Sequence, residues 1–244
     1  MENNIIHGRN TVIEALNSGR TLDKILIKDG ENEGSIRSIF AIAKENGIKI
    51  ERVKKKTLDT LTEFAQHQGV VAYAPPISYV SISDILQNAK KKSQQPFIII
   101  LNNITDPHNF GAIIRTAEAS GAHGIIIPNR RAAIITTTVE KTSAGAVNYI
   151  PISKVTNLVQ TIEWLKKQNI WVVGASFEGT TYFNTDLKGP IAIVIGSEGE
   201  GLSSLVEKKC DFITKIPMLG KIQSLNASVA ASLIMYEVIR QRLC

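Results

Sequence analysis

The first third of the chain alternates short apolar runs with helical patterns. The runs that predict strands lie at residues 25–27, 48–50 and 70–73. Apolar residues with helical spacing lie at residues 10–18 and 35–46. This alternation predicts a small α/β domain over residues 1–76.

A polar stretch follows this domain. Pro75 and Pro76 stop the last predicted strand. The residues after them are mostly polar and include the lysine run 90–92, so they predict a linker around one short helix over residues 77–95. The lysine run itself is typical of a solvated linker surface.

From Pro96 onward the predicted strands are apolar at every position. They read FIIIL at 97–101, GIII at 124–127, IWVVG at 170–174 and IAIVIG at 191–196. Strands that are apolar on both faces are typical of a parallel sheet covered by helices on both sides. The helical patterns lie at residues 110–120, 157–168, 203–209 and 225–242. We therefore expect one parallel-sheet α/β domain over residues 96–244.

The composition is that of an ordinary globular protein, and its one informative feature is a positive net charge. Of 244 residues, 43% are hydrophobic and 20% are charged, which excludes a disordered tail, a collagenous repeat and a coiled coil. The net charge of +6 suits a polyanionic partner. Each side of residue 95 has 14 basic and 11 acidic residues, so no basic tail carries the excess.

Cysteine usage and hydropathy restrict the setting. Cys210 and Cys244 lie far apart and form no Cys-x-x-Cys motif, which argues against a disulfide framework and a zinc site. The longest apolar runs are about a quarter of the roughly 20 residues that a membrane-spanning helix needs. Since the first residues also lack the pattern of a signal peptide, we expect a cytoplasmic protein without membrane contact.

The loops exclude two common nucleotide-binding folds. The glycines of GSEGEGLSS, which starts at Gly196, are not spaced as in a dinucleotide-binding loop, and Gly220-Lys221 is followed by Ile222 rather than the Ser or Thr of a P-loop. The four histidines show no metal-ligand spacing, so we expect no metal site.

Polar residues follow three of the predicted strands, at the sheet edge where α/β proteins bind ligands. In the first loop Asn109 is a candidate N-cap, and Arg115 follows six residues later. Because Arg115 is flanked by Ile113 and Ile114, we expect it to be partly buried and to need a hydrogen-bonding or anionic partner. The alternative is a simple cap and a solvated arginine.

The second loop places Glu198 and Glu200 among glycines, and the third places Ser224 and Asn226 before a helix. Helix capping alone explains the types of Ser224 and Asn226 about as well as a functional role does. Three separate loops nevertheless supply amide, carboxylate, hydroxyl or guanidinium groups at strand ends. Together they indicate a pocket that works by polar placement.

Three segments carry a specific resemblance. DPHNFGAIIRTAEASG, IVIGSEGEGLS and IPMLGKIQSLNASVA resemble, in order and spacing, the three motifs of the SpoU (TrmH) family of ribose 2'-O-methyltransferases. IHGRNTVIEAL and HQGVVAY resemble the substrate-binding domain of the branch that methylates a guanosine ribose in 23S (large-subunit) ribosomal RNA. The resemblance spans nearly the whole chain.

The resemblance implies an enzyme that uses S-adenosylmethionine, a trefoil knot at the C-terminal end of the parallel-sheet (SPOUT) domain, an RNA-binding N-terminal domain, and a homodimer. It also implies two sets of site residues. The catalytic positions fall on Asn109, Arg115, Glu198, Ser224 and Asn226. The cofactor-binding positions fall on Gly196, Ile216 and Leu225.

The partner implied is RNA rather than DNA, because only RNA has a ribose 2'-hydroxyl. Arg115 as general base has a high cost, since its neutral form lies about 7 kcal/mol uphill at pH 7. We therefore interpret it as a phosphate clamp that stabilises charge on the 2'-oxygen. Two alternatives stay open: the same chemistry on a transfer RNA or another ribosomal RNA site, and a non-catalytic RNA-binding or ribosome-assembly protein of the same fold.

Overall fold

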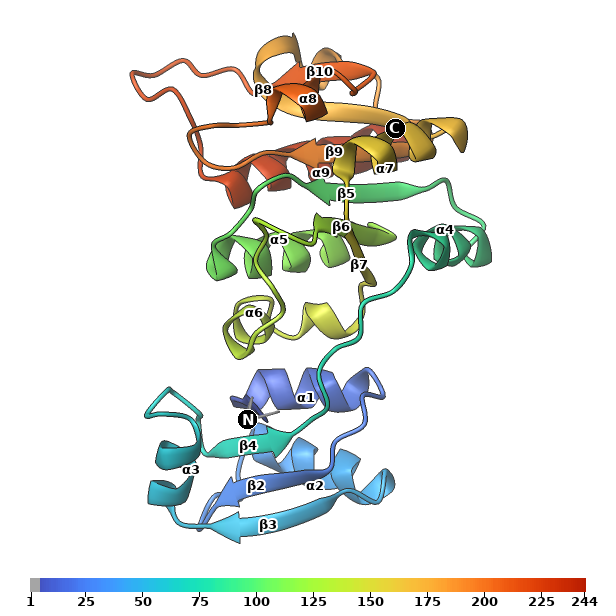
Figure 1. Cartoon of the computed structure of the whole chain (residues 1–244). Helices are drawn as coiled ribbons and strands as arrows, with labels where there is room; N and C mark the ends of the chain where they lie inside the picture. Colours follow the sequence, from blue (N-terminus) through green and yellow to red (C-terminus); the bar gives the residue numbers. More distant parts are fainter. Residues whose placement is uncertain (1–4) are drawn as a thin grey trace. The chain divides into compact units, whose positions relative to one another are not determined.

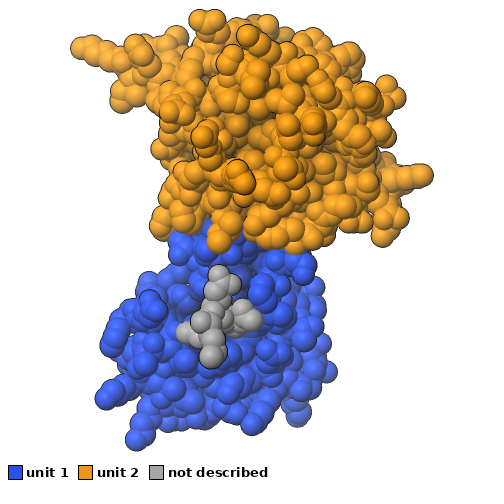
Figure 2. All heavy atoms as spheres, viewed as in Figure 1, with its two compact units in different colours: residues 1–78, 135–149 blue, residues 79–134, 150–244 orange. Residues whose placement is uncertain are grey.

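The computed structural model describes residues 5–244 (Figure 1). They divide into two compact units, coloured separately in Figure 2. Unit 1 contains the described residues up to 78 and residues 135–149, and unit 2 contains residues 79–134 and 150–244. None of the helices in the described part of the chain is long and apolar enough to span a membrane.

Unit 1 is built on a four-stranded mixed sheet. Its strands, in the spatial order β1-β4-β2-β3, are β1 (Ile5–His7), β4 (Val70–Tyr73), β2 (Lys24–Lys28) and β3 (Lys49–Val53). Strands β2 and β3 are parallel, and β4 is antiparallel to both β1 and β2. The helices are α1 (Arg9–Asn17), α2 (Ser35–Glu45), α3 (Lys55–Leu61) and α6 (Thr137–Thr142), with a 3-10 turn η1 (Ala146–Asn148).

Strand β2 shows why this sheet is apolar on both faces. Ile25 and Ile27 pack in one core with residues of α1 and α2. Leu26, which points to the opposite face, packs with Leu58 of α3. Helices therefore cover both faces, as the short apolar run predicts.

Unit 2 is built on a six-stranded sheet in which every pair is parallel. In spatial order its strands are β10 (Phe212–Lys215), β8 (Trp171–Thr181), β9 (Ile191–Ile195), β5 (Phe97–Leu101), β6 (Gly124–Pro128) and β7 (Ile152–Val155). The helices are α4 (Ile82–Lys91), α5 (Pro107–Ala119), α7 (Leu158–Lys167), α8 (Ser204–Glu207) and α9 (Ala227–Leu243), with a 3-10 turn η2 (Tyr182–Asn184). The predicted parallel-sheet α/β class is confirmed.

Helices pack on both faces of this sheet. Residues of α4, α7 and α8 share one core with alternate residues of β5, such as Ile98 and Ile100. Helices α5 and α9 pack on each other and contact β6 and β9 (Figure 1). The trefoil knot stays a prediction, because strand order alone does not establish it.

The division into units differs from the predicted boundaries at residues 135–149. This segment was expected in the second domain, but it clusters with unit 1. The Arg20 guanidinium lies 2.6 Å from the Glu140 carboxylate and also donates to the Asn148 side chain. Burial raises the pKa of Glu140, against the effect of Arg20. A buried carboxylate needs such a partner, and hydrophobic patterning cannot reveal it.

The predicted linker over residues 77–95 is wrong in part, because α4 is integral to unit 2. Ile85 and Ala89 are buried, and Ile85 belongs to the core of the parallel sheet. A Cβ on Gly124 would lie 2.6 Å from the Ile85 side chain, so this glycine of β6 leaves the space that α4 fills. Ser81 and Asp84 form a capping box that starts the helix.

Candidate active site

The strand order brings two loops side by side. Strand β5 pairs in parallel with β9, and Leu101 lies opposite Ile195 at their carboxyl ends. The buried Asn102 joins the loops that follow: its N–H donates to the Ile195 carbonyl, and its side-chain oxygen accepts from the Ser203 N–H, at 2.8 Å each. Sequence reasoning missed Asn102, although a polar residue directly after an all-apolar strand was a usable signal.

The loop after β9 is a tight turn that requires glycine. Ser197 and Gly201 exchange two backbone hydrogen bonds of 3.0 and 3.1 Å. A Cβ on Gly196 would lie 2.2 Å from the carbonyl carbon of Gly201. Gly199 and Gly201 both have positive φ. The turn leaves Glu198 exposed at its tip.

Helix α5 places Asn109 in front of this turn. The helix begins at Pro107, and its N-cap is Asp106, whose carboxylate accepts from the Asn109 N–H at 2.8 Å. The interpretation of Asn109 as the N-cap is therefore wrong, because Asp106 already satisfies that backbone donor. The Asn109 side chain is instead free to donate from Nδ2 to Glu198 Oε1 at 3.0 Å.

Helix α9 supplies the third side chain. Asn226 is its N-cap, and Oδ1 accepts from the N–H groups of Ser228 and Val229. The Nδ2 group donates to Asn109 Oδ1 at 2.8 Å and to the Glu198 carboxylate. The capping role and a role in a polar site are thus compatible, because they use opposite ends of one amide.

Asn109, Glu198 and Asn226 form a cluster that we call the polar triad. Glu198 accepts from both asparagine side chains and from the Ala227 N–H at 3.2 Å. The Ala227 N–H belongs to the first turn of α9, where the helix dipole favours a negative charge. The triad therefore holds an exposed carboxylate in one orientation, and such a carboxylate can accept a hydrogen bond from a hydroxyl group.

Arg115 is exposed, so its expected partial burial is wrong. The buried residues of α5 are spaced as one helix face and include Phe110, Ile114 and Ala117, and this spacing turns Arg115 toward solvent. Neighbours in sequence are not neighbours in space on a helix. Within residues 5–244 Arg115 has no hydrogen bond or ion pair, so its guanidinium is available to a ligand.

A cavity of about 870 Å³ lies at the carboxyl ends of β8, β9 and β10. Its lining includes all three predicted cofactor positions, Gly196, Ile216 and Leu225, together with Glu198 and Ser224. Asn109, Arg115 and Asn226 are not among the lining residues. The volume is in the range of small-molecule sites.

Two cavity-lining side chains escaped sequence reasoning. Phe177 of β8 is half exposed, and the buried Thr214 of β10 donates to the Thr180 carbonyl at 3.0 Å. Phe177 lies beyond residue 174, where the sequence predicted that strand to end. Thr214 lies in a strand for which the sequence predicted no bounds. No group of three or more potential metal ligands occurs among residues 5–244.

Comparisons with known protein families match both parts of the chain. The SpoU rRNA Methylase family matches residues 96–236. A model described as RNA 2'-O ribose methyltransferase substrate binding matches residues 5–80. Every residue of the polar triad and of the cavity lining therefore lies within the first match.

Relatives with similar sequences cover the whole length. YacO of Bacillus subtilis, which is named as a TrmH family tRNA/rRNA methyltransferase, is 48% identical over 242 residues, covering 99% of this chain and 97% of that protein. A protein of Staphylococcus aureus with the same family name is 46% identical over 243 residues, covering 99% and 98%.

Solved structures agree with this. The SpoU methyltransferase AviRb of Streptomyces viridochromogenes, in complex with AdoMet, superposes with a TM-score of 0.80 at 26% identity and covers 98% of this chain and 90% of its own. An AdoMet-bound rRNA methyltransferase of Sinorhizobium meliloti gives 0.78 at 26% identity, covering 98% and 88%.

Proposed function

This chain belongs to the SpoU rRNA Methylase family, and we propose from this premise that its acceptor is a guanosine in 23S ribosomal RNA. The reaction is S-adenosylmethionine-dependent 2'-O-methylation of ribose in tRNA or rRNA. The observation that supports the methyl-transfer chemistry is the polar triad at the edge of the 870 Å³ cavity. It places an oriented carboxylate beside a volume suited to the methyl donor. The target is supported by the resemblance of IHGRNTVIEAL and HQGVVAY to the branch that methylates a guanosine ribose.

The cavity fits S-adenosylmethionine by size and lining. Gly196 lines it where the turn closes on the Gly201 backbone, and Ile216 and Leu225 give it an apolar wall. These three residues would hold the cofactor, mainly through backbone groups at Gly196. When bound, S-adenosylmethionine supplies a methyl group on a positively charged sulfur, ready for in-line transfer to an oxygen.

The acceptor ribose would bind at the triad, with a neighbouring phosphate held by Arg115. Arg115 is permanently charged and has no partner of its own in the described chain, so it can grip a phosphate and stabilise negative charge on the 2'-oxygen. Glu198, held by Asn109 and Asn226, would accept a hydrogen bond from the ribose. Ser224, on the cavity wall, would orient the same sugar.

An exposed apolar face on α9 supports the homodimer. Val229, Leu233 and Tyr236 follow one another at intervals of four and three residues, and 46%, 38% and 52% of their surfaces are exposed. This spacing puts them on one side of the helix. Burying that face in a second copy would remove apolar surface from water.

The N-terminal domain, proposed over residues 1–76, would supply RNA affinity and target choice. Its match to a substrate-binding model supports this division, and the triad lies wholly in unit 2. A transfer RNA remains the competing target of the same reaction.

The deciding experiment maps 2'-O-methylation across ribosomal and transfer RNA from cells with and without the gene. We expect one guanosine in 23S ribosomal RNA to lose its methyl group when the gene is absent, and to regain it with purified protein and S-adenosylmethionine. A loss confined to transfer RNA would contradict the proposed target and leave the reaction unchanged.

A further inference from the structure

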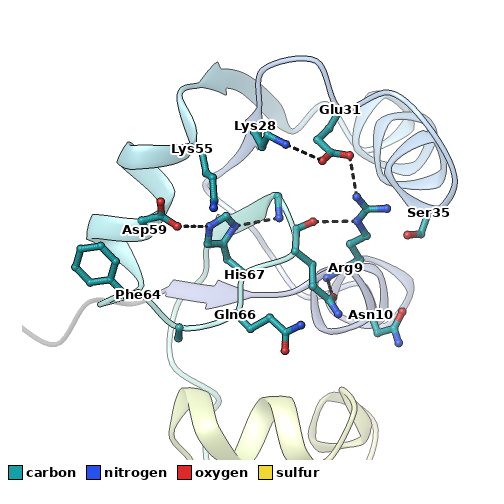
Figure 3. Close-up of a pocket in the computed structure, with 13 residues that line it drawn as sticks. Arg9, Asn10, Lys28, Glu31, Ser35, Lys55, Asp59, Phe64, Gln66 and His67 are labelled. Carbon is teal, nitrogen blue, oxygen red and sulfur yellow. Dashed lines mark hydrogen bonds and ion pairs between the residues drawn. The ribbon is translucent and has the colours of Figure 1, made fainter.

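Unit 1 contains a second cavity, of about 720 Å³, that the methyl-transfer chemistry does not use (Figure 3). It lies where the start of α1 meets the segment before β4. The Arg9 N–H donates to Gln68 Oε1 at 3.0 Å, and Arg9 Nε donates to the Gln68 carbonyl at 2.9 Å. The two N-terminal motifs noted in the sequence, IHGRNTVIEAL and HQGVVAY, thus meet at this cavity.

The walls of this cavity are fixed by internal bonds. Glu31 accepts from Arg9 at 2.8 Å and from Lys28 at 3.2 Å. His67, which is buried, accepts from the Gly69 N–H at Nδ1, so its ring proton lies on Nε2 and is donated to Asp59 at 2.9 Å. Figure 3 shows the Asp59–His67 bond and the Arg9–Glu31 bond on opposite sides of the group of lining residues. The cavity is therefore formed before any ligand binds.

Phe64 stands at the rim in an unusual conformation. Its side chain is 83% exposed, and both Phe64 and Glu63 have positive φ, at 61° and 51°. Bulky residues other than glycine seldom adopt this conformation. The Phe64 N–H donates to the Asp59 carbonyl at 2.7 Å, which holds the turn. This turn leaves the aromatic ring of Phe64 in water, where it can stack on a flat ligand.

Several polar side chains of the lining have no partner among the described residues. Within residues 5–244 the amide groups of Asn10 and Gln66 make no hydrogen bond, and the Lys55 ammonium group makes no ion pair. An amide offers one acceptor and two donors, which matches the edge of a nucleobase. A free ammonium group suits a phosphate.

We propose that this cavity binds one unpaired nucleotide of the RNA substrate. Phe64 stacks on the base, Asn10 and Gln66 bond its edge, and Lys55 contacts a neighbouring phosphate. A base inside a duplex is covered on both faces, so only an unpaired one can stack on Phe64. The inference rests on the proposed function for its RNA substrate and adds a recognition site outside the methyl-transfer domain.

The test measures binding of the full-length protein to labelled RNA hairpins in the absence of S-adenosylmethionine. One set carries a single bulged nucleotide, made with each of the four bases, and a matched hairpin lacks the bulge. We expect the wild type to prefer at least one bulged hairpin. Phe64→Ala should weaken binding to it about tenfold, and Phe64→Trp should retain it, because base–aromatic stacking supplies the difference.

One further variant and two control variants separate this site from general charge and exposure. Lys55→Ala should reduce the slope of log affinity against log salt by about 0.7, the value of one single-strand phosphate contact. Lys44→Ala, at the far end of α2, and Phe183→Ala, an exposed aromatic of unit 2, should change neither quantity. Thermal unfolding checks that each variant is folded.

The inference is overturned if the wild type binds bulged and paired hairpins equally, or if Phe64→Ala behaves like Phe183→Ala. Equal affinity for the hairpin and for free guanosine or adenosine monophosphate would assign the cavity to a free nucleotide and also overturn it. A protein that prefers the bulge but transfers no methyl group would refute the proposed function and leave the nucleotide site standing.

Discussion

Unit 1 holds Arg20 in a buried network, whereas unit 2 presents Arg115 to solvent without a partner among the residues that the structure describes. The Arg20 guanidinium donates to Glu140, to Asn148 and to the Pro75 carbonyl, and 11% of its side chain is exposed. Both terminal nitrogens of the Arg20 guanidinium are therefore already bonded within the fold. The comparison separates an arginine that stabilises a fold from one that is free to act on a substrate.

The largest expected effect is at Arg115. Arg115→Ala should lower methyl transfer about 10³-fold, as loss of a charge-stabilising donor does, and leave S-adenosylmethionine affinity and the unfolding midpoint unchanged. Single-turnover kinetics with RNA, calorimetry and urea unfolding measure the three quantities. A lower urea unfolding midpoint in Arg115→Ala would show that Arg115 has a structural role, which contradicts the comparison.

Arg115→Lys distinguishes a clamp from a base. Lysine has a pKa about two units lower but lacks the planar fork that grips a phosphate with two donors. As a clamp, the lysine variant should stay severely impaired as the pH is raised toward 10. Recovery that follows the titration of a single amine would identify residue 115 as the base instead.

Arg20→Met should show the opposite pattern. It leaves the buried Glu140 without its cationic partner and should destabilise unit 1 by about 3 kcal/mol. Both tryptophans, Trp164 and Trp171, lie in unit 2, so their fluorescence reports only that unit. We expect the urea transition to shift by circular dichroism but not by tryptophan fluorescence, and S-adenosylmethionine affinity to persist. Equal shifts by both probes would mean that the units unfold together.

Surface ion pairs provide the control for Arg20. The Lys49 ammonium group lies 2.7 Å from the Glu51 carboxylate on the exposed side of β3. Because exposed pairs contribute little, Lys49→Ala should leave both transitions in place.

A smaller effect separates two glycines of the cavity that we propose for the cofactor. Gly196→Ala places a Cβ against the Gly201 backbone, so the turn that carries Glu198 must shift, and S-adenosylmethionine affinity should fall about tenfold. Gly220→Ala meets nothing within 4 Å and should leave affinity within about twofold. Calorimetry on both variants is the measurement. Equal losses would show that flexibility of the lining, rather than the turn, matters for binding.

The smallest effect is a pH dependence in unit 1. Burial raises the pKa of Glu140 in the folded protein above its ordinary value of 4.5, so the folded state binds the proton more tightly than the unfolded state. This contribution is complete below pH 4.5 and is lost as the pH rises through the folded pKa. Glu140→Gln should flatten this part of the urea-midpoint profile, measured by circular dichroism. An unchanged profile would assign the dependence to other groups.

The central strands could be predicted because burial on both faces leaves an uninterrupted apolar run. Strands β5 and β9 are buried at every residue, and their predicted bounds match closely. The edge strand β7 escaped prediction, and β10 was predicted only as a strand that breaks at Pro217, without bounds. At an edge, exposed and buried residues mix, as Phe212 and Thr214 do in β10, and no period emerges from four residues.

The sequence by itself determined that the apolar strands after Pro96 form a parallel sheet, that polar residues follow these strands, and that those polar residues match one family's motifs. Only the tertiary structure decided which polar residues meet. Asn109 and Glu198 are 89 residues apart, and they touch because β9 inserts beside β5 rather than following β8 at the sheet edge. Likewise, the phase of α5 turned Arg115 to solvent, and residues 135–149 pack with unit 1, where Glu140 pairs with Arg20. Local patterns record whether a residue is buried, but the partner of a polar group depends on segments that the chain brings together only when it folds.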